Sequence, residues 1–239
     1  MWRRLEVDDY DAVMALRQAV LSSLPDPDFY VREDDEHMFV SGHLDVFGES
    51  VGFFDGDDLV AYLALTTDLV SSGEDVEFAA CVPTLNDVVF AAAMVLPEYR
   101  GRSLHRAGIR RHITIAQAFG ARRGMAQISA RNHRSLRSYL SEGFRITRAV
   151  EYPDGRRRLL LERDLVSADT TALIDDVALV DLNDFDGIRR ELTETRAGHR
   201  LLPVGSTALM VVGTARSTAP GIPASAESLA AEVEWSSTS

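Results

Sequence analysis

Hydrophobic and polar positions alternate with two different periods along this chain, and together they predict a mixed α/β fold. A continuous apolar run at 88–95 is too short for a typical helix, so we interpret it as a strand buried on both faces. Pro97 follows the strand, and apolar residues recur at helical spacing from Leu104 onward. The pattern predicts a strand, a tight basic turn at Arg100 and Gly101, and then a helix.

The same patterns predict further elements on both sides of this unit. Upstream, we expect a strand at 2–7, a helix at 10–24, a hairpin of 50–54 and 59–66, and a short strand near 77–82, whereas the acidic segment 29–43 has only weak periodicity. Downstream, we expect a strand at 125–130, a helix from Asn132, and a closing hairpin of 146–152 and 156–161.

The basic turn has the chemistry of an anion-binding site. Free backbone N–H groups and the positive end of a helix dipole meet where the helix begins, which suits a phosphate or pyrophosphate. Arg102, Arg106 and Arg110 follow at four-residue spacing along one side of the helix, within reach of such phosphates. We expect Arg111 and His112 to face solvent.

Two motifs resemble those of the GCN5-related N-acetyltransferase (GNAT) superfamily. The segment VLPEYRG matches the family form V-x-P-x-Y-R-G, and the segment NHRSLRSYLSEGF at 132–144 matches N-x-x-[SA]-x-x-x-Y-x-x-x-G-F. The frame of the first motif falls on Arg100, Gly101, Arg102, Ser103, Leu104 and His105. Ser103 stands where the family has glycine, and His105 where it has glycine or alanine. The resemblance covers about residues 1–164.

The resemblance implies an α/β fold with a mixed, mostly antiparallel central sheet flanked by helices. It also implies acetyl-CoA or another acyl-CoA as cosubstrate, no metal, and a pyrophosphate held by the frame from Arg100 to His105. A backbone N–H at Met94 or Val95 would polarise the thioester carbonyl, and Tyr139 would donate a proton to the departing thiolate. Asn132 would contact the cofactor arm, although capping its helix explains this residue equally well.

Several alternatives stay open at this stage. The base that deprotonates the amine has three carboxylate candidates, Asp87, Glu77 and Glu98. The ring of His105 either blocks the pyrophosphate or points outward and adds a donor. A degenerate, non-catalytic binding or regulatory module therefore remains an alternative to an enzyme, as does a transferase that uses an aminoacyl-tRNA or a carrier protein.

Charge is distributed unevenly along the chain. Residues 1–99 hold 4 Arg and 21 acidic residues, residues 100–163 hold 16 Arg and 4 acidic residues, and residues 164–239 hold 5 Arg and 12 acidic residues. The positive charge thus lies with the predicted phosphate site, as a polyanionic cofactor requires. The acidic surroundings favour a small, cationic amine as acceptor, and a net charge of -12 argues against nucleic acid. The absence of lysine excludes an acyl-lysine intermediate.

Residues 165–239 form an additional segment, which we expect to be a small α/β extension. It includes a predicted helix from Asn183 or Asp184 to near Gly198, a strand at 208–215 and a short helix at 226–235. We expect it to pack on the first domain or across a homodimer. No apolar run approaches the ~20 residues of a membrane span and no signal peptide is recognisable, so we expect a cytoplasmic protein. The single cysteine, Cys81, is expected to be a buried thiol.

Overall fold

The computed structural model describes residues 1–72, 86–167, 173–205 and 207–216. Its strands are β1 (Trp2–Arg4), β2 (Gly48–Asp55), β3 (Asp58–Thr66), β4 (Asp87–Val95), β5 (Arg123–Ser129), β6 (Arg145–Glu151), β7 (Arg157–Asp164), β8 (Leu173–Asp181), β9 (Ala197–Val204) and β10 (Thr207–Arg216). The α-helices are α1 (Tyr10–Ser22), α2 (Glu36–Leu44), α3 (Leu69–Ser72), α5 (Leu104–Ala118), α6 (His133–Ser141) and α7 (Phe185–Glu191).

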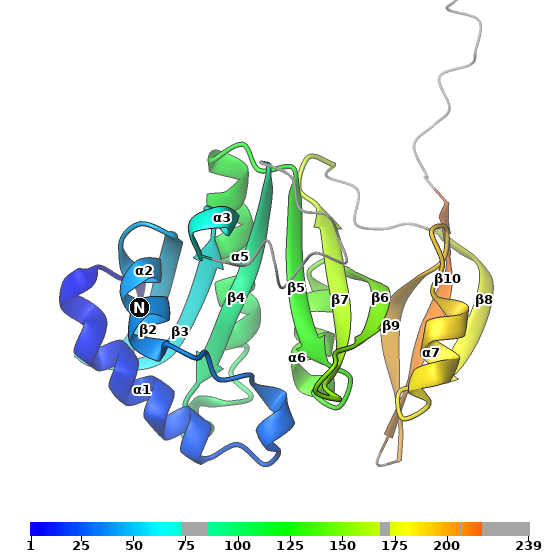
Figure 1. The fold of residues 1–239 in the computed structure, drawn as a ribbon, viewed down its shortest axis with the longest axis horizontal. Helices are drawn as coiled ribbons and strands as arrows, with labels where there is room; N and C mark the ends of the chain where they lie inside the picture. Colours follow the sequence, from blue (N-terminus) through cyan, green and yellow to red (C-terminus); the bar gives the residue numbers. More distant parts are fainter. Residues whose placement is uncertain (73–85, 168–172, 206, 217–239) are drawn as a thin grey trace, which may run out of the picture.

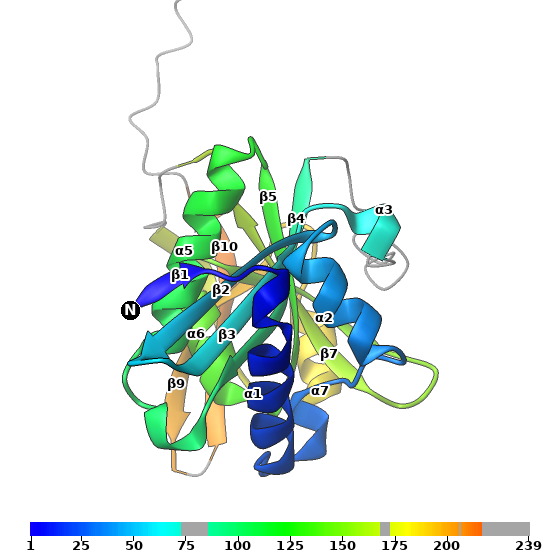
Figure 2. The ribbon, with the colours of Figure 1, turned by 90° about the vertical axis from the view of Figure 1, so that its left-hand side faces the viewer.

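The strands form one sheet in the order β1-β2-β3-β4-β5-β7-β6-β9-β10-β8 (Figure 1). Every pairing among the described strands is antiparallel except that of β4 with β5. Helices α1 and α2 cover one face, and α5 and α6 cover the other (Figure 2). The mixed, mostly antiparallel sheet flanked by helices confirms the predicted fold class.

The central strands place one buried side chain on each face of the sheet in turn. On β3, Tyr62 and Ala64 belong to the cluster under α1 and α2, whereas Leu63 and Leu65 belong to the cluster under α5 and α6. Helix α5 approaches β3 closely because Gly108 has no side chain, and a Cβ there would lie 2.4 Å from the nearest Leu63 methyl carbon.

Strands β4 and β5 pair only at their beginnings. Asp87, Val88 and Val89 pair with residues 123–125, and β4 then continues to Val95 without a partner on this side (Figure 1). On its other side, β4 pairs with β3 through a register shift at Ala91. The sheet is therefore open between the two strands at the end that leads into the basic turn.

The chain after residue 164 continues the same sheet. Strand β9 meets β6 at Gly198 opposite Ile146, and β10 and β8 follow outward. The predicted strand at 208–215 is confirmed, but the predicted long helix up to Gly198 is wrong. Helix α7 ends at Glu191 and Gly198 lies in β9. A Cβ at Gly198 would lie 2.5 Å from the Met210 sulfur, so this glycine serves close strand packing and not a helix end.

Two other sequence predictions need comment. His112 is fully buried and contacts the Phe90 ring edge-on, so the expectation that it faces solvent is wrong. Its position on α5 next to Ile113 and Ile109 belongs to the apolar face of the helix, which overrides its polar side chain. The strand near 77–82, the helix at 226–235 and Cys81 lie outside the described residues.

Candidate functional site

A cleft of about 920 Å³ opens where β4 ends and α5 and α6 begin. Eight of the ten site residues expected from the sequence line it, namely Met94, Val95, Arg100, Gly101, Ser103, Leu104, His105 and Asn132. The fold thus brings together two motifs that are 30 residues apart in the sequence. The two expected residues that do not line the cleft are Arg102 and Tyr139.

The basic turn depends on two residues with positive φ. Gly101 has φ of 82°, and Ser103, which caps the beginning of α5, has φ of 59° and ψ of 16°. Left-handed backbone favours glycine, which explains why the GNAT motif has a glycine at the position of Ser103. Ser103 itself adopts this left-handed conformation, so the turn forms here without a glycine at that position.

Four arginines line the cleft, whereas no carboxylate does among the described residues. The Arg100 Nε donates to the Val95 carbonyl at 3.3 Å, which holds the guanidinium at the end of β4. Partial burial and the nearby Arg134 lower the pKa of Arg100. Arg106 and Arg131 complete the set. Arg106 and Arg131 are ion-paired with Glu142 and Asp26 at 2.9 and 2.8 Å, so the positive charge that favours a polyanionic ligand comes mainly from Arg100 and Arg134.

Three arginines of α5 differ in what they contact. Arg106 and Arg110 form ion pairs with the two oxygens of Glu142 at 2.9 and 2.7 Å, and Glu142 is 7% exposed. Arg102 is exposed, and its guanidinium lies 4.7 Å from the centre of the Tyr99 ring. Arg106 lines the cleft, while Arg102 and Arg110 do not. The spacing predicted that all three side chains reach one anion, but of the three only Arg106 lines the cleft.

His105 turns inward and not toward solvent. Its ring packs edge-on against Tyr139 with 5.5 Å between ring centres. Its Nε2 atom is buried and has no hydrogen-bond partner among the described residues. Burial lowers the pKa of His105 to about 4, so the imidazole is neutral at pH 7. The ring lines the cleft at the position where the motif has a glycine or alanine.

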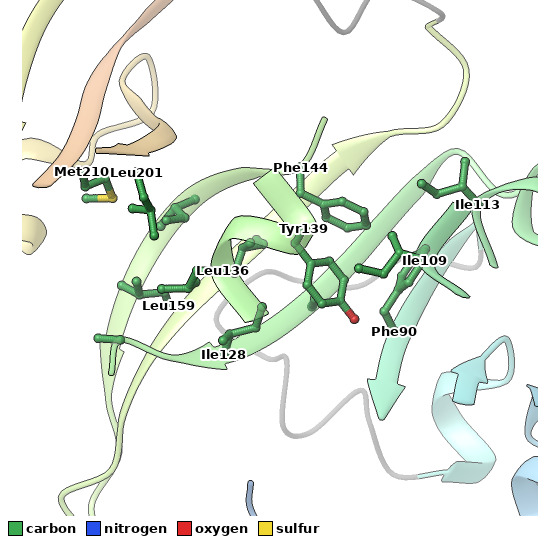
Figure 3. Close-up of a cluster of buried hydrophobic side chains, with 14 of the residues drawn as sticks. Phe90, Ile109, Ile113, Ile128, Leu136, Tyr139, Phe144, Leu159, Leu201 and Met210 are labelled. Carbon is green, nitrogen blue, oxygen red and sulfur yellow. The ribbon is translucent and has the colours of Figure 1, made fainter. Parts of the chain in front are cut away.

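Tyr139 lies in the aromatic core behind His105. Its ring packs among Phe90, Ile109 and Phe144, and its hydroxyl points away from Phe144 (Figure 3). The side chain is 3% exposed, and burial raises its pKa. The expected catalytic tyrosine is therefore next to the cleft, with the ring of His105 as its neighbour on the cleft side.

Asn132 and the end of β4 both line the cleft. The Asn132 side chain accepts from the backbone N–H of Ser135 at 3.1 Å, so its capping role is confirmed, and it also lines the cleft. Met94 and Val95 are the last residues of β4, where the strand has left β5. This is the place where a ligand that lies along the turn would reach the interior of the sheet.

Of the three carboxylates considered as general bases, the two that the structure describes, Asp87 and Glu98, do not line the cleft. Asp87 is 3% exposed and forms an ion pair with Arg123 at 2.6 Å, which indicates a structural role. Glu98 is exposed in the turn after β4, and Glu77 lies outside the described residues. Among the described residues, the titratable groups that line the cleft and are not arginine or tyrosine are His105 and His133.

Sequence reasoning missed the apolar part of the cleft, which adjoins the basic turn where Arg100 Nη2 donates to the Ser23 hydroxyl at 3.4 Å. This part comes from the end of α1 and the segment after it, and consists of Val20, Leu24, Pro25 and Phe29. Its residues carry no motif. Arg131 and Arg134 were missed as well, although their positions beside Asn132 could have indicated them.

Comparison with solved structures identifies the fold of this chain. The ribosomal-protein-S18-alanine N-acetyltransferase from Escherichia coli superposes with a TM-score of 0.51 at 16% identity, over 71% of this chain and 96% of that one. An acetyltransferase of the GNAT family from Streptococcus pneumoniae gives 0.52 at 16%, over 69% and 98%. This chain has the GNAT fold. The yncA protein from Salmonella typhimurium, solved with its cofactor acetyl-CoA, gives 0.51 at 18%, over 74% and 98%.

The GNAT fold is thus established by shape, since no protein-family model and no curated protein matches the sequence. Within the described part of the chain, no group of three His, Cys, Asp or Glu side chains is placed to hold a metal ion. The helices searched there include none that is long and apolar enough to cross a membrane.

Proposed function

We propose that this protein is an acyltransferase that moves an acetyl or other short acyl group from acyl-CoA to the amine of a small acceptor. The observation that carries the proposal is the cleft itself. It runs from a turn lined by Arg100, Gly101 and Ser103 to the end of β4 at Val95, where β4 pairs with β3 and no longer with β5, and among the described residues four arginines and no carboxylate line it.

The residues present fit coenzyme A. The turn offers backbone N–H groups at the beginning of α5, and Arg100 and Arg134 supply charge for the phosphates. The pantetheine arm would follow the cleft toward Met94 and Val95, so that the thioester lies between β4 and β5. There a backbone N–H of β4 would polarise the thioester carbonyl.

Transfer would proceed by direct attack in a ternary complex. The lone pair of the amine attacks the thioester carbon, a C–N bond forms, and the C–S bond breaks with its electron pair leaving on sulfur. An acceptor that arrives as an ammonium ion first loses one proton to solvent, which frees the lone pair. A second proton leaves the nitrogen after the C–N bond has formed, and the thiolate takes up one proton. We propose Tyr139 as the donor to the thiolate, which requires the sulfur to approach the hydroxyl past His105.

The acceptor should carry a cationic amine, because the acidic charge of residues 1–99 attracts cations toward that half of the fold. We further propose that the protein acts in the cytoplasm and does not engage nucleic acid or membranes. A homodimer remains compatible with this function.

A second candidate is a GNAT-fold binding module without turnover, or a transferase that takes its acyl group from another carrier. The position of His105 favours it, because the ring stands between the cleft and Tyr139. Calorimetric titration with acetyl-CoA, followed by thiol release with a panel of amines, separates the candidates. Binding with amine-dependent thiol release supports the enzyme, binding without release supports the module, and no binding supports another carrier.

A further inference from the structure

Arg17 is a fully buried arginine on the apolar face of α1. Its side chain is 0% exposed, and its neighbours on the same face are the core residues Val13 and Val20. The guanidinium carbon lies 5.3 Å from the centre of the Tyr30 ring and 5.1 Å from that of Phe39. Aromatic rings thus surround a cation in the layer between α1, α2 and the sheet.

None of the polar atoms in this cluster has a partner at hydrogen-bonding distance. The Nε and both Nη atoms of Arg17 make no hydrogen bond with any described residue, and neither do the hydroxyls of Tyr30 and Tyr62. The Glu36 carboxylate forms an ion pair with Arg17 Nη2 at 3.6 Å, a distance that is too long for a hydrogen bond. Five N–H donors and two hydroxyls therefore converge on one place, where the guanidinium has an ion pair with Glu36 but no hydrogen bond.

A second buried arginine, Arg158, differs from Arg17 because it has hydrogen-bond partners. Arg158 is 3% exposed, and its Nη1 donates to Asp28 at 2.7 Å and to the Arg157 carbonyl at 3.0 Å. Burying a guanidinium without such partners is strongly unfavourable. Arg17 has instead the ion pair with Glu36 and the faces of the Tyr30 and Phe39 rings, and a bound carboxylate would add the hydrogen bonds that this arrangement lacks.

This cluster adjoins the cleft through three separate elements. Val20 lies one helical turn after Arg17, Phe29 precedes Tyr30 in the sequence, and both line the cleft. Met94, which also lines the cleft, pairs with Tyr62 across β3 and β4. The cluster thus adjoins the part of the cleft that is lined by α1 and the segment after it.

We propose that Arg17, with the hydroxyls of Tyr30 and Tyr62, recognises a carboxylate of the acceptor. The inference rests on the proposed acyl transfer and defines its substrate class as amino acids or their close derivatives. The planar guanidinium matches a carboxylate with two parallel hydrogen bonds, and the two tyrosines donate to its remaining lone pairs. Glu36, whose side chain is 23% exposed, moves aside when the carboxylate enters.

A first experiment tests this site without any turnover. The Arg17 Nε–H signal is assigned in a 15N NMR spectrum by its loss in Arg17→Lys, and the protein is titrated with sodium acetate or, at equal ionic strength, sodium chloride. A saturable shift with acetate alone supports the carboxylate site. The same response to both salts overturns it, whether or not the protein binds acetyl-CoA, so this result is independent of the proposed function.

A second experiment compares stability in urea. Arg17→Met keeps the length of the side chain and removes the unsatisfied charge, so we expect it to unfold at the same or a higher urea concentration than the wild type. The matched variant Arg158→Met breaks a satisfied buried pair and should unfold at a lower concentration. Equal destabilisation of both variants would show that Arg17 is a structural cation and would overturn the proposal.

A third experiment measures thiol release with L-amino acids and with their carboxamides. The wild type should prefer the free carboxylates. Arg17→Met should raise KM for them about 10- to 100-fold while kcat stays within a few-fold, and it should leave the carboxamides almost unaffected. Equal KM values for acids and carboxamides in the wild type would overturn the assignment. Absence of release with every amine would instead count against the proposed function, and the acetate titration then decides on the site.

Discussion

Replacing Ser103 with glycine should stabilise the turn that begins α5. Ser103 has φ of 59°, and left-handed backbone costs an L-residue about 1–2 kcal/mol relative to glycine. Glycine loses more freedom on folding, which offsets about 0.4–1 kcal/mol of this gain. The serine side chain makes no capping hydrogen bond that would be lost. We therefore expect a net gain of about 1 kcal/mol, or about 2–4 °C in Tm for a chain of this size.

Gly101 provides the matched opposite change in the same turn. It has φ of 82°, and no atom lies within 4 Å of a Cβ built there. Gly101→Ala therefore introduces backbone strain without a clash, and we expect a loss of about 1 kcal/mol after the smaller unfolded-state entropy of alanine is included. Thermal and urea unfolding followed by circular dichroism measure both variants. Destabilisation by Ser103→Gly, or stabilisation by Gly101→Ala, would refute the left-handed assignment of this turn.

Three further outcomes follow from the site and the core. Tyr139→Phe should lower kcat at least about tenfold with little change in acetyl-CoA affinity, and an unchanged kcat would remove its role as proton donor. Arg134→Ala should weaken acetyl-CoA binding about tenfold or more, whereas Arg102→Ala, outside the cleft, should change it little; calorimetry compares them. Burial lowers the pKa of His43 to about 4 and of His112 to about 3, from 6.5 in the unfolded chain. Between pH 6.5 and 4 only the unfolded chain takes up these protons, so the free energy of unfolding should be lower at pH 5 than at pH 7 by about 1–2 kcal/mol per histidine. Urea unfolding at the two pH values measures this change, and equal stabilities would show that the two histidines are exposed.

Much of the central unit could be predicted because its signals are local. The apolar run that forms β4, the turn at Arg100 and the helix from Leu104 each follow from spacing and turn chemistry within a few residues. The capping of α6 by Asn132 is local in the same way. These elements also carry the motifs, so most of the expected site residues were found.

The remaining features depend on contacts between distant parts of the chain. His112 is polar in sequence, but the face of α5 that packs on Phe90 buries it. Gly198 was predicted to end a helix, because the sequence does not show that β9 pairs with β6 and β10. Arg17 looks like an ordinary helix arginine, and only tertiary structure shows that it lacks hydrogen bonds. Periodicity predicts which face is apolar, and it does not predict which polar residue is enclosed there.

Calorimetric titration of the wild type and Arg100→Ala with acetyl-CoA, and with free coenzyme A as the control for the phosphate contacts, tests the central claim most directly. The arginine-lined cleft predicts micromolar binding of both ligands to the wild type, weakened about tenfold or more by Arg100→Ala. Absence of binding to the wild type, or equal affinities for both proteins, would contradict the placement of coenzyme A in this cleft.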